Sequence, residues 1–145
     1  MKKTNKVLQY ISWLTILVAL ALLFILGYWL FYPYKPMILN EGTGTVLNKD
    51  KIVSVNEDIL FKLNYCKEIP VGAEITTSFV DGVIYNTTPI ISNLPVGCEE
   101  KIIQVYVPSA LPSGEFNVRQ VLRYKINPIR KIDVIITSEK FTVIH

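Results

Sequence analysis

The chain has 145 residues, of which 50% are hydrophobic, and a net charge of +3 at pH 7. Four lysines and no acidic residue lie in residues 1–36, so residues 37–145 contain eleven basic and twelve acidic side chains. The basic excess therefore belongs to the N-terminal flank, and we predict no nucleic-acid partner, because nucleic-acid binding needs a basic patch on the folded domain. The remaining length allows one small domain.

Residues 7–32 form an uncharged, mostly apolar stretch that predicts a transmembrane helix. At about 1.5 Å per residue, this stretch is longer than the roughly 30 Å hydrocarbon core of a bilayer. Pro33 and Pro36 are expected to end the helix, because proline lacks a backbone donor. Aromatic residues, which favour the headgroup level, lie toward both ends of the helix: Tyr10, Trp13, Tyr28, Trp29, Tyr32 and Tyr34.

The alternative interpretation of this segment is a cleaved signal peptide. Its apolar run is longer than the usual 7–15 residues, and Gly27 to Tyr32 shows no small-residue cleavage pattern. We therefore predict an uncleaved signal anchor, with the lipid bilayer as a partner. The three lysines of residues 1–6 predict a cytoplasmic N-terminus and an extracytoplasmic C-terminal domain, whether periplasmic, extracellular or lumenal.

Residues 33–51 are predicted to be a tether between the helix and the domain. Glu41-Gly42-Thr43-Gly44-Thr45, near its centre, has the small polar composition of a flexible link. The glycines are too few for a phosphate-binding loop and follow no predicted strand.

Beyond residue 51, apolar and polar residues alternate as in half-buried strands. Gln120 and Val121 interrupt the alternation, Asp81-Gly82 indicates a β-hairpin, and the last apolar run is expected to break near Thr137-Ser138-Glu139. The predicted strands cover 52–55, 59–65, 75–79, 83–85, 102–107, 115–127 and 132–144. About seven strands favour a mainly β fold, a single antiparallel β-sandwich over residues 52–145.

The strand order and spacing of residues 52–145 resemble an immunoglobulin-like or fibronectin-type sandwich. Leu111-Pro112-Ser113-Gly114-Glu115-Phe116-Asn117-Val118 resembles the start of a late strand in such modules, and Phe141-Thr142-Val143 resembles their last strand. The domain differs from antibody domains because it contains no tryptophan. The whole layout also resembles small phage-encoded single-pass membrane proteins. Neither resemblance implies an activity.

Cys66 and Cys98 are the only cysteines. They do not form a Cys-x-x-Cys motif, so the sequence gives little support for thioredoxin-type chemistry or a structural zinc site. In an extracytoplasmic β domain, this pair predicts a disulfide between the end of one strand and the turn over 95–100. Two free buried thiols are the alternative.

The sequence contains no recognisable catalytic set. His145 is the last residue, and without a second histidine the Ser-His-Asp and Cys-His arrangements lack a general base. The acidic pairs Glu57-Asp58 and Glu99-Glu100 lie in turns with too few Asp and Asn residues for a calcium loop. We predict no metal, no cofactor, no small-molecule substrate and no enzymatic activity, with a hydrolase or metalloenzyme as the least favoured alternative.

Arg119, Arg123 and Lys125 are predicted to form an outward-facing basic stripe, which Arg130 and Lys131 extend. Such a stripe is commonly a solvated sheet face, and the alternative is contact with an acidic partner or lipid headgroups. Asn86-Thr87-Thr88 fits the N-glycosylation pattern, which is common by chance.

Together these features favour a membrane-anchored, non-enzymatic binding or structural module with a protein partner, as part of a larger assembly. The alternative is a phage- or virus-encoded envelope or lysis-related membrane protein.

Overall fold

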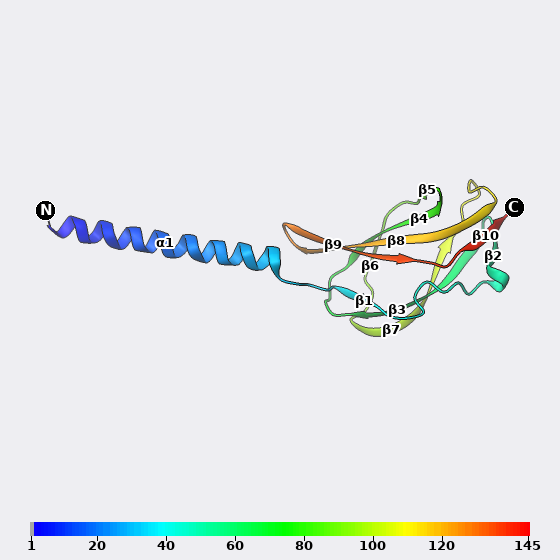
Figure 1. Cartoon of the computed structure of the whole chain (residues 1–145), viewed down its shortest axis with the longest axis horizontal. Helices are drawn as coiled ribbons and strands as arrows, with labels where there is room; N and C mark the ends of the chain where they lie inside the picture. The colour runs from blue at the N-terminus through cyan, green and yellow to red at the C-terminus, as the bar shows by residue number, and fades with distance from the viewer. Residues whose placement is uncertain (1) are drawn as a thin grey trace. The chain divides into compact units, whose positions relative to one another are not determined.

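The computed structural model describes residues 2–145, with the side chains of residues 6–145 (Figure 1). The chain forms two compact units: residues 1–34 with 127–130, and residues 35–126 with 131–145.

The first unit contains α1 (Lys2–Phe31), a single continuous helix. Its segment Lys6–Phe31 has a mean hydropathy of 2.5 and is long and apolar enough to cross a membrane, although a signal sequence meets the same criteria. Thr15 donates a hydrogen bond from its hydroxyl to the carbonyl oxygen of Ile11, at 2.9 Å. The helix therefore satisfies this polar group within itself, as a lipid environment requires.

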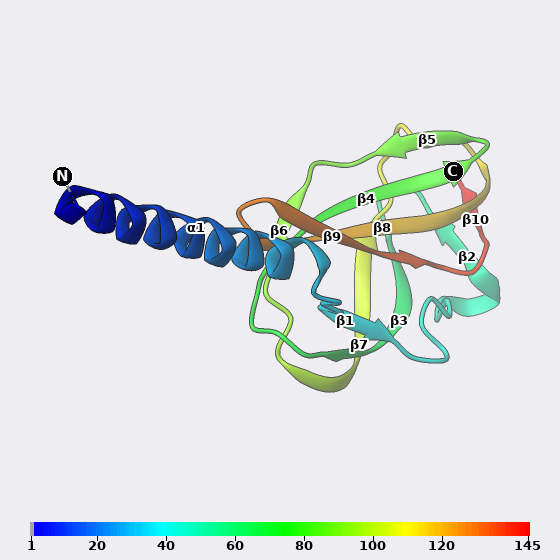
Figure 2. The ribbon, with the colours of Figure 1, turned by 60° about the vertical axis from the view of Figure 1, so that its left-hand side comes forward.

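The second unit is a sandwich of two sheets (Figure 2). The smaller sheet has the order β1-β3-β7, with β1 at Met37–Leu39, β3 at Asp58–Lys67 and β7 at Gly97–Tyr106. The larger sheet has the order β2-β10-β8-β4-β5, with β2 at Ile52–Ser54, β10 at Phe141–Ile144, β8 at Gly114–Asn127, β4 at Ala73–Asp81 and β5 at Val83–Asn86. In addition, β6 (Ile90–Ser92) pairs with β4, and β9 (Arg130–Thr137) pairs with β8. The fold is mainly β, a sandwich of two sheets that is consistent with the predicted Ig-like class. The predicted antiparallel pairing does not hold throughout, because β2 and β10 pair in parallel.

The core lies between the two sheets, and one face each of β3 and β8 contributes more buried hydrophobic residues than any other strand. On β3, alternate residues are almost fully buried: Ile59, Phe61, Leu63 and Tyr65. On β8, the buried residues are Phe116, Val118, Leu122 and Tyr124. Burying each such side chain stabilises the fold by roughly 1.5–3 kcal/mol. The two-residue period of the sequence is therefore the direct cause of this layer.

β8 is continuous, as predicted, and the break in the sequence alternation at Gln120 and Val121 is not a break in the alternation of burial. The alternation continues through Gln120, which is 6% exposed and belongs to the core-facing side of the strand. Its side-chain amide donates a hydrogen bond to the hydroxyl of Thr77 on β4, at 3.2 Å. A polar residue can occupy this inward position because a partner satisfies it.

Two turn predictions are confirmed. β4 and β5 form the hairpin at Asp81-Gly82, where Gly82 has φ of +66°. The last apolar run breaks between Thr137, where β9 ends, and Phe141, where β10 begins. Ser138 lies in this break and stays bound to β8, because its hydroxyl accepts a hydrogen bond from the backbone N–H of Val118 at 2.9 Å.

The predicted tether over 33–51 is largely folded instead. β1 pairs antiparallel with β3, and Met37 is buried in the core together with Val46. A short 3-10 helix, Lys49–Lys51, then leads into β2. Residues 32–36 thus connect α1 to β1, the first strand of the sandwich.

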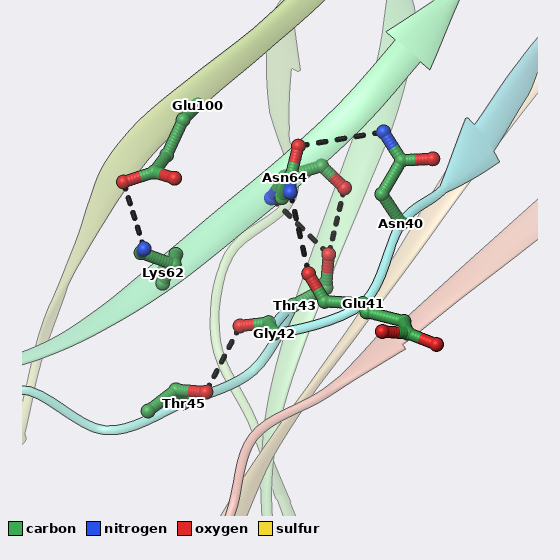
Figure 3. A network of polar contacts seen from close by, with 8 residues as sticks. All are labelled: Asn40, Glu41, Gly42, Thr43, Thr45, Lys62, Asn64 and Glu100. Carbon is green, nitrogen blue, oxygen red and sulfur yellow. Dashed lines mark hydrogen bonds and ion pairs between the residues drawn. The ribbon is translucent and has the colours of Figure 1, made fainter.

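The turn over 40–45 is bound tightly to β3 (Figure 3). The Thr43 hydroxyl donates to the carbonyl oxygen of Asn64 at 2.7 Å and accepts from the backbone N–H of the same residue at 3.1 Å. The backbone N–H of Gly44 donates to the carbonyl oxygen of Lys62 at 2.7 Å. Gly42 and Gly44 have φ of +81° and +90°, so the glycines provide a tight turn here and not flexibility.

This packing predicts that Gly44→Ala destabilises the sandwich by about 2–4 kcal/mol, because the positive φ disfavours a side chain and a Cβ atom would lie 2.2 Å from the carbonyl oxygen of Thr137. Urea unfolding of the detergent-solubilised chain, followed by circular dichroism, measures the loss. Gly82→Ala is the matched control, since its φ is also positive but no atom lies within 4 Å of the added Cβ; we expect a loss of about 1 kcal/mol. Equal losses would mean that the turn is not packed against β9.

Candidate binding surfaces

The predicted disulfide is present. Cys66 on β3 and Cys98 on β7 are directly opposite each other, with Cα atoms 3.9 Å apart. Cys98 lies within the strand, and not in the predicted turn over 95–100. The bond therefore joins two neighbouring strands of one sheet where β3 ends and β7 begins, whereas the disulfide of antibody domains connects the two sheets.

Lys67, next to the disulfide, is a buried cation that the sequence reasoning missed. It is 4% exposed, and its ammonium group donates to the carbonyl oxygen of Leu94 at 2.6 Å. The same group lies 6.0 Å from the ring centroid of Tyr124. Burial lowers the pKa of Lys67. The sequence did contain a signal for this burial. Buried and half-exposed residues alternate along β3, and Lys67, two residues after the buried Tyr65, falls on the core side.

The three residues of the predicted basic stripe differ in whether they are ion-paired. Arg119, Arg123 and Lys125 are all exposed on the outer face of β8. Arg123 makes two hydrogen bonds to the carboxylate of Asp133 on β9, each 2.9 Å long. This pair raises the pKa of Arg123 and lowers the pKa of Asp133. The charge in the middle of the stripe is therefore neutralised within the protein.

The two outer members of the stripe differ from Arg123. Within residues 6–145, neither Arg119 nor Lys125 makes an ion pair. Arg119 borders two shallow hollows of about 360 and 370 Å³ on the outer face of the larger sheet. Contact of these two cations with an acidic partner or with lipid headgroups stays the alternative to a solvated sheet face.

A hollow that the sequence did not reveal opens between the two sheets on the side of β6 and β7. Its larger part has a volume of about 570 Å³ and its smaller part about 270 Å³. Ile90, Gln104 and Gln120 line both parts, so we treat them as one inter-sheet groove. The only sequence signal for this groove was Gln120, the polar residue within an otherwise apolar core face.

β7 forms one rim of the inter-sheet groove and is an edge strand, since it pairs only with β3. Its first half carries charges at Glu99, Glu100 and Lys101, but residues 102–106 carry none. Ile102 is 60% exposed, and Ile91 on β6, the other rim, is 83% exposed. The open side of the sandwich therefore combines free backbone groups with exposed apolar side chains.

The predicted interface aromatics lie along α1 and just after it. Tyr10 and Trp13 are exposed in the first half of the helix. At the other end, the rings of Tyr28 and Tyr32 have centroids 4.9 Å apart, and those of Tyr32 and Tyr34 are 4.6 Å apart. The position of these rings at the headgroup level stays a prediction.

Among the described residues, no three or more His, Cys, Asp and Glu side chains are close enough together to hold a metal ion. Asn86 is exposed at the rim of the inter-sheet groove, where its side-chain oxygen accepts a hydrogen bond from the Ser78 hydroxyl at 2.7 Å.

No protein-family model matches the chain, and no curated protein matches it. Among solved structures, the chain is similar to a Niemann-Pick type C2 protein from the Japanese carpenter ant, with a TM-score of 0.42 and 12% sequence identity. The match covers 77% of this chain and 98% of the ant protein. A likeness of this extent carries no argument about activity.

The disulfide leads to a second prediction. The double variant Cys66→Ser, Cys98→Ser should lose about 3–4 kcal/mol of unfolding free energy, because the bond closes a loop of sequence separation 32. Urea unfolding in detergent measures it. As a control, a reducing agent should destabilise the natural chain by a similar amount and leave the double variant unchanged. A loss below about 1 kcal/mol would contradict a stabilising role.

Proposed function

We propose that this protein is a membrane-anchored, non-enzymatic binding module that displays its Ig-like domain outside the cytoplasm and binds a segment of another protein. The observation that carries the proposal is the open side of the sandwich, where the free edge of β7 borders the inter-sheet groove.

The free edge favours an extended polypeptide as the ligand. An edge strand presents backbone N–H and C=O groups at strand spacing, and another strand is the partner that pairs with both. Proteins usually protect such edges with charges, and here charge is confined to residues 99–101. The uncharged part, from Ile102 to Tyr106, is therefore the segment that we expect to receive a strand.

The inter-sheet groove supplies a site for the side chains of that ligand. Its larger part is lined by apolar Ile90 and Val105 and by polar Thr77, Gln104 and Gln120. Gln120 and Thr77 already bond to each other, so the base of the groove presents few unsatisfied polar atoms. A strand paired with β7 would direct alternate side chains toward this groove. Mixed lining of this kind favours apolar side chains with an occasional amide or hydroxyl.

The predicted anchor would hold the binding site beside the membrane. The segment Lys6–Phe31 has the length and hydropathy of a membrane span, and the N-terminal lysines support a cytoplasmic N-terminus. A small domain held beside a membrane meets its partner at a high effective concentration. The partner is accordingly expected in the same membrane or just outside it, as a member of a larger assembly.

Site-specific photo-crosslinking tests this proposal. A benzophenone amino acid at Gln104, which lines both parts of the groove, should crosslink the full-length chain in its native membrane to one defined protein. The matched control carries the same group at Ile135, 46% exposed on β9 and a lining residue of an outer-face hollow.

A companion variant, Ile102→Lys, should reduce the crosslink at position 104 by about tenfold, because it places a charge on the apolar edge. Ile135→Lys should leave that crosslink unchanged. Crosslinking at 135 but not at 104 would move the binding site to the outer face, and no protein adduct at 104 would overturn the proposal.

A further inference from the structure

The strand register places four segments at one end of the sandwich, which we call the anchor-side pole: residues 32–36, 68–72, 93–96 and 127–131. Met37 is opposite Lys67 on β3, and Lys67 is opposite Gly97 on β7. In the larger sheet, Ala73 is opposite Tyr124 on β8. The loops over 68–72 and 93–96 join the two sheets directly, so both sheets end at the same pole.

Chain connectivity keeps this pole close to the end of α1. Only residues 32–36 separate α1 from β1. Five residues span at most about 18 Å even when fully extended. If α1 spans a bilayer, the anchor-side pole therefore lies within reach of the lipid headgroups.

The charges of the sandwich are divided between its two ends. The four segments of the anchor-side pole carry three cations, Lys35, Arg130 and Lys131, and one acid, Glu68. Lys125 is also exposed, two residues before the last of these segments. The opposite end carries the acids Glu57, Asp58, Asp81 and Glu115, of which Glu115 lies 3.8 Å from the ammonium group of Lys140. The end of the sandwich at which the linker enters is therefore the more basic one.

Exposed apolar residues lie among these cations. Ile129 is 53% exposed at the tip of the β8–β9 hairpin, directly before Arg130 and Lys131. Val96 is 52% exposed in another loop of the same pole, over 93–96. An apolar tip flanked by cations suits the membrane interface, because the cations meet lipid phosphates while the apolar group leaves water.

We propose that the anchor-side pole is a second binding site, which binds anionic phospholipid headgroups through Lys125, Arg130 and Lys131 and inserts Ile129 among them. The short linker favours a lipid surface over a soluble acidic protein, since the membrane is always within reach. The inference rests on the anchoring part of the proposed function and is independent of the inter-sheet groove.

Spin labels on the full-length chain in nanodiscs test this inference. A nitroxide is attached to Ile129→Cys, with Ser113→Cys at the opposite end as the matched control and Leu20→Cys within α1 as the test of anchoring. Nanodiscs of phosphatidylcholine alone are compared with discs containing phosphatidylglycerol. The experiment measures how often the nitroxide collides with oxygen, which dissolves in lipid, and how often it collides with a nickel complex that stays in water.

We expect the label at 129 to collide with the nickel complex at least fivefold less in phosphatidylglycerol discs than in phosphatidylcholine discs, with no change at 113. High salt should reverse the effect, because screening weakens the attraction. When Lys125→Gln and Lys131→Gln are introduced together into the variant labelled at position 129, the difference between the two kinds of disc should disappear. Lys140→Gln, at an exposed lysine elsewhere, should leave this difference unchanged.

Two results would overturn the inference in distinguishable ways. A lipid-shielded label at 20, with labels at 129 and 113 equally open to nickel in both kinds of disc, refutes headgroup binding and leaves the anchor intact. A label at 20 that is open to nickel refutes the anchor itself, and with it the proposed function.

Discussion

The sandwich depends on the burial of one face of β3 against one face of β8. These two long strands are the central strands of their sheets and contribute the largest fully buried side chains, among them Phe61, Tyr65, Phe116 and Tyr124. Each of the other strands pairs with β3 or β8, or with a strand that does. β1 and β7 pair with β3, whereas β10, β9 and β4 pair with β8, so the register of these strands is set against the two central ones.

That dependence explains what the sequence could and could not predict. The long strands could be predicted from their alternation of apolar and polar residues, and the turn at Asp81-Gly82 from its Asp-Gly pair, which is typical of β-hairpins. β1 and β6 have three residues each, too few for a period, and they exist as strands only because β3 and β4 offer them an edge. The folded turn over 40–45 was missed for a related reason, since glycine serves flexible links and tight turns equally well.

The binding surfaces show the same division. The disulfide could be predicted from two cysteines in a domain predicted to be extracytoplasmic, but its place within one sheet required the β3–β7 register. The basic stripe was visible as alternating residues, yet Asp133, which neutralises Arg123, comes from the next strand. The inter-sheet groove and the free edge of β7 depend wholly on strand order, which no local pattern encodes. Surfaces built from one strand were therefore predictable, and surfaces built between strands were not.

The short first strand has a mechanical consequence. A pull on α1 reaches the sandwich at Met37, where three residue pairs hold β1 against the end of β3. Met37 is also buried in the core, so tension on the anchor is passed into the packed interior as well as into the pairing of β1 with β3. The Cys66–Cys98 bond joins β3 covalently to β7 at the same end of the smaller sheet. The strand that receives the load from β1 is therefore the one that is covalently reinforced.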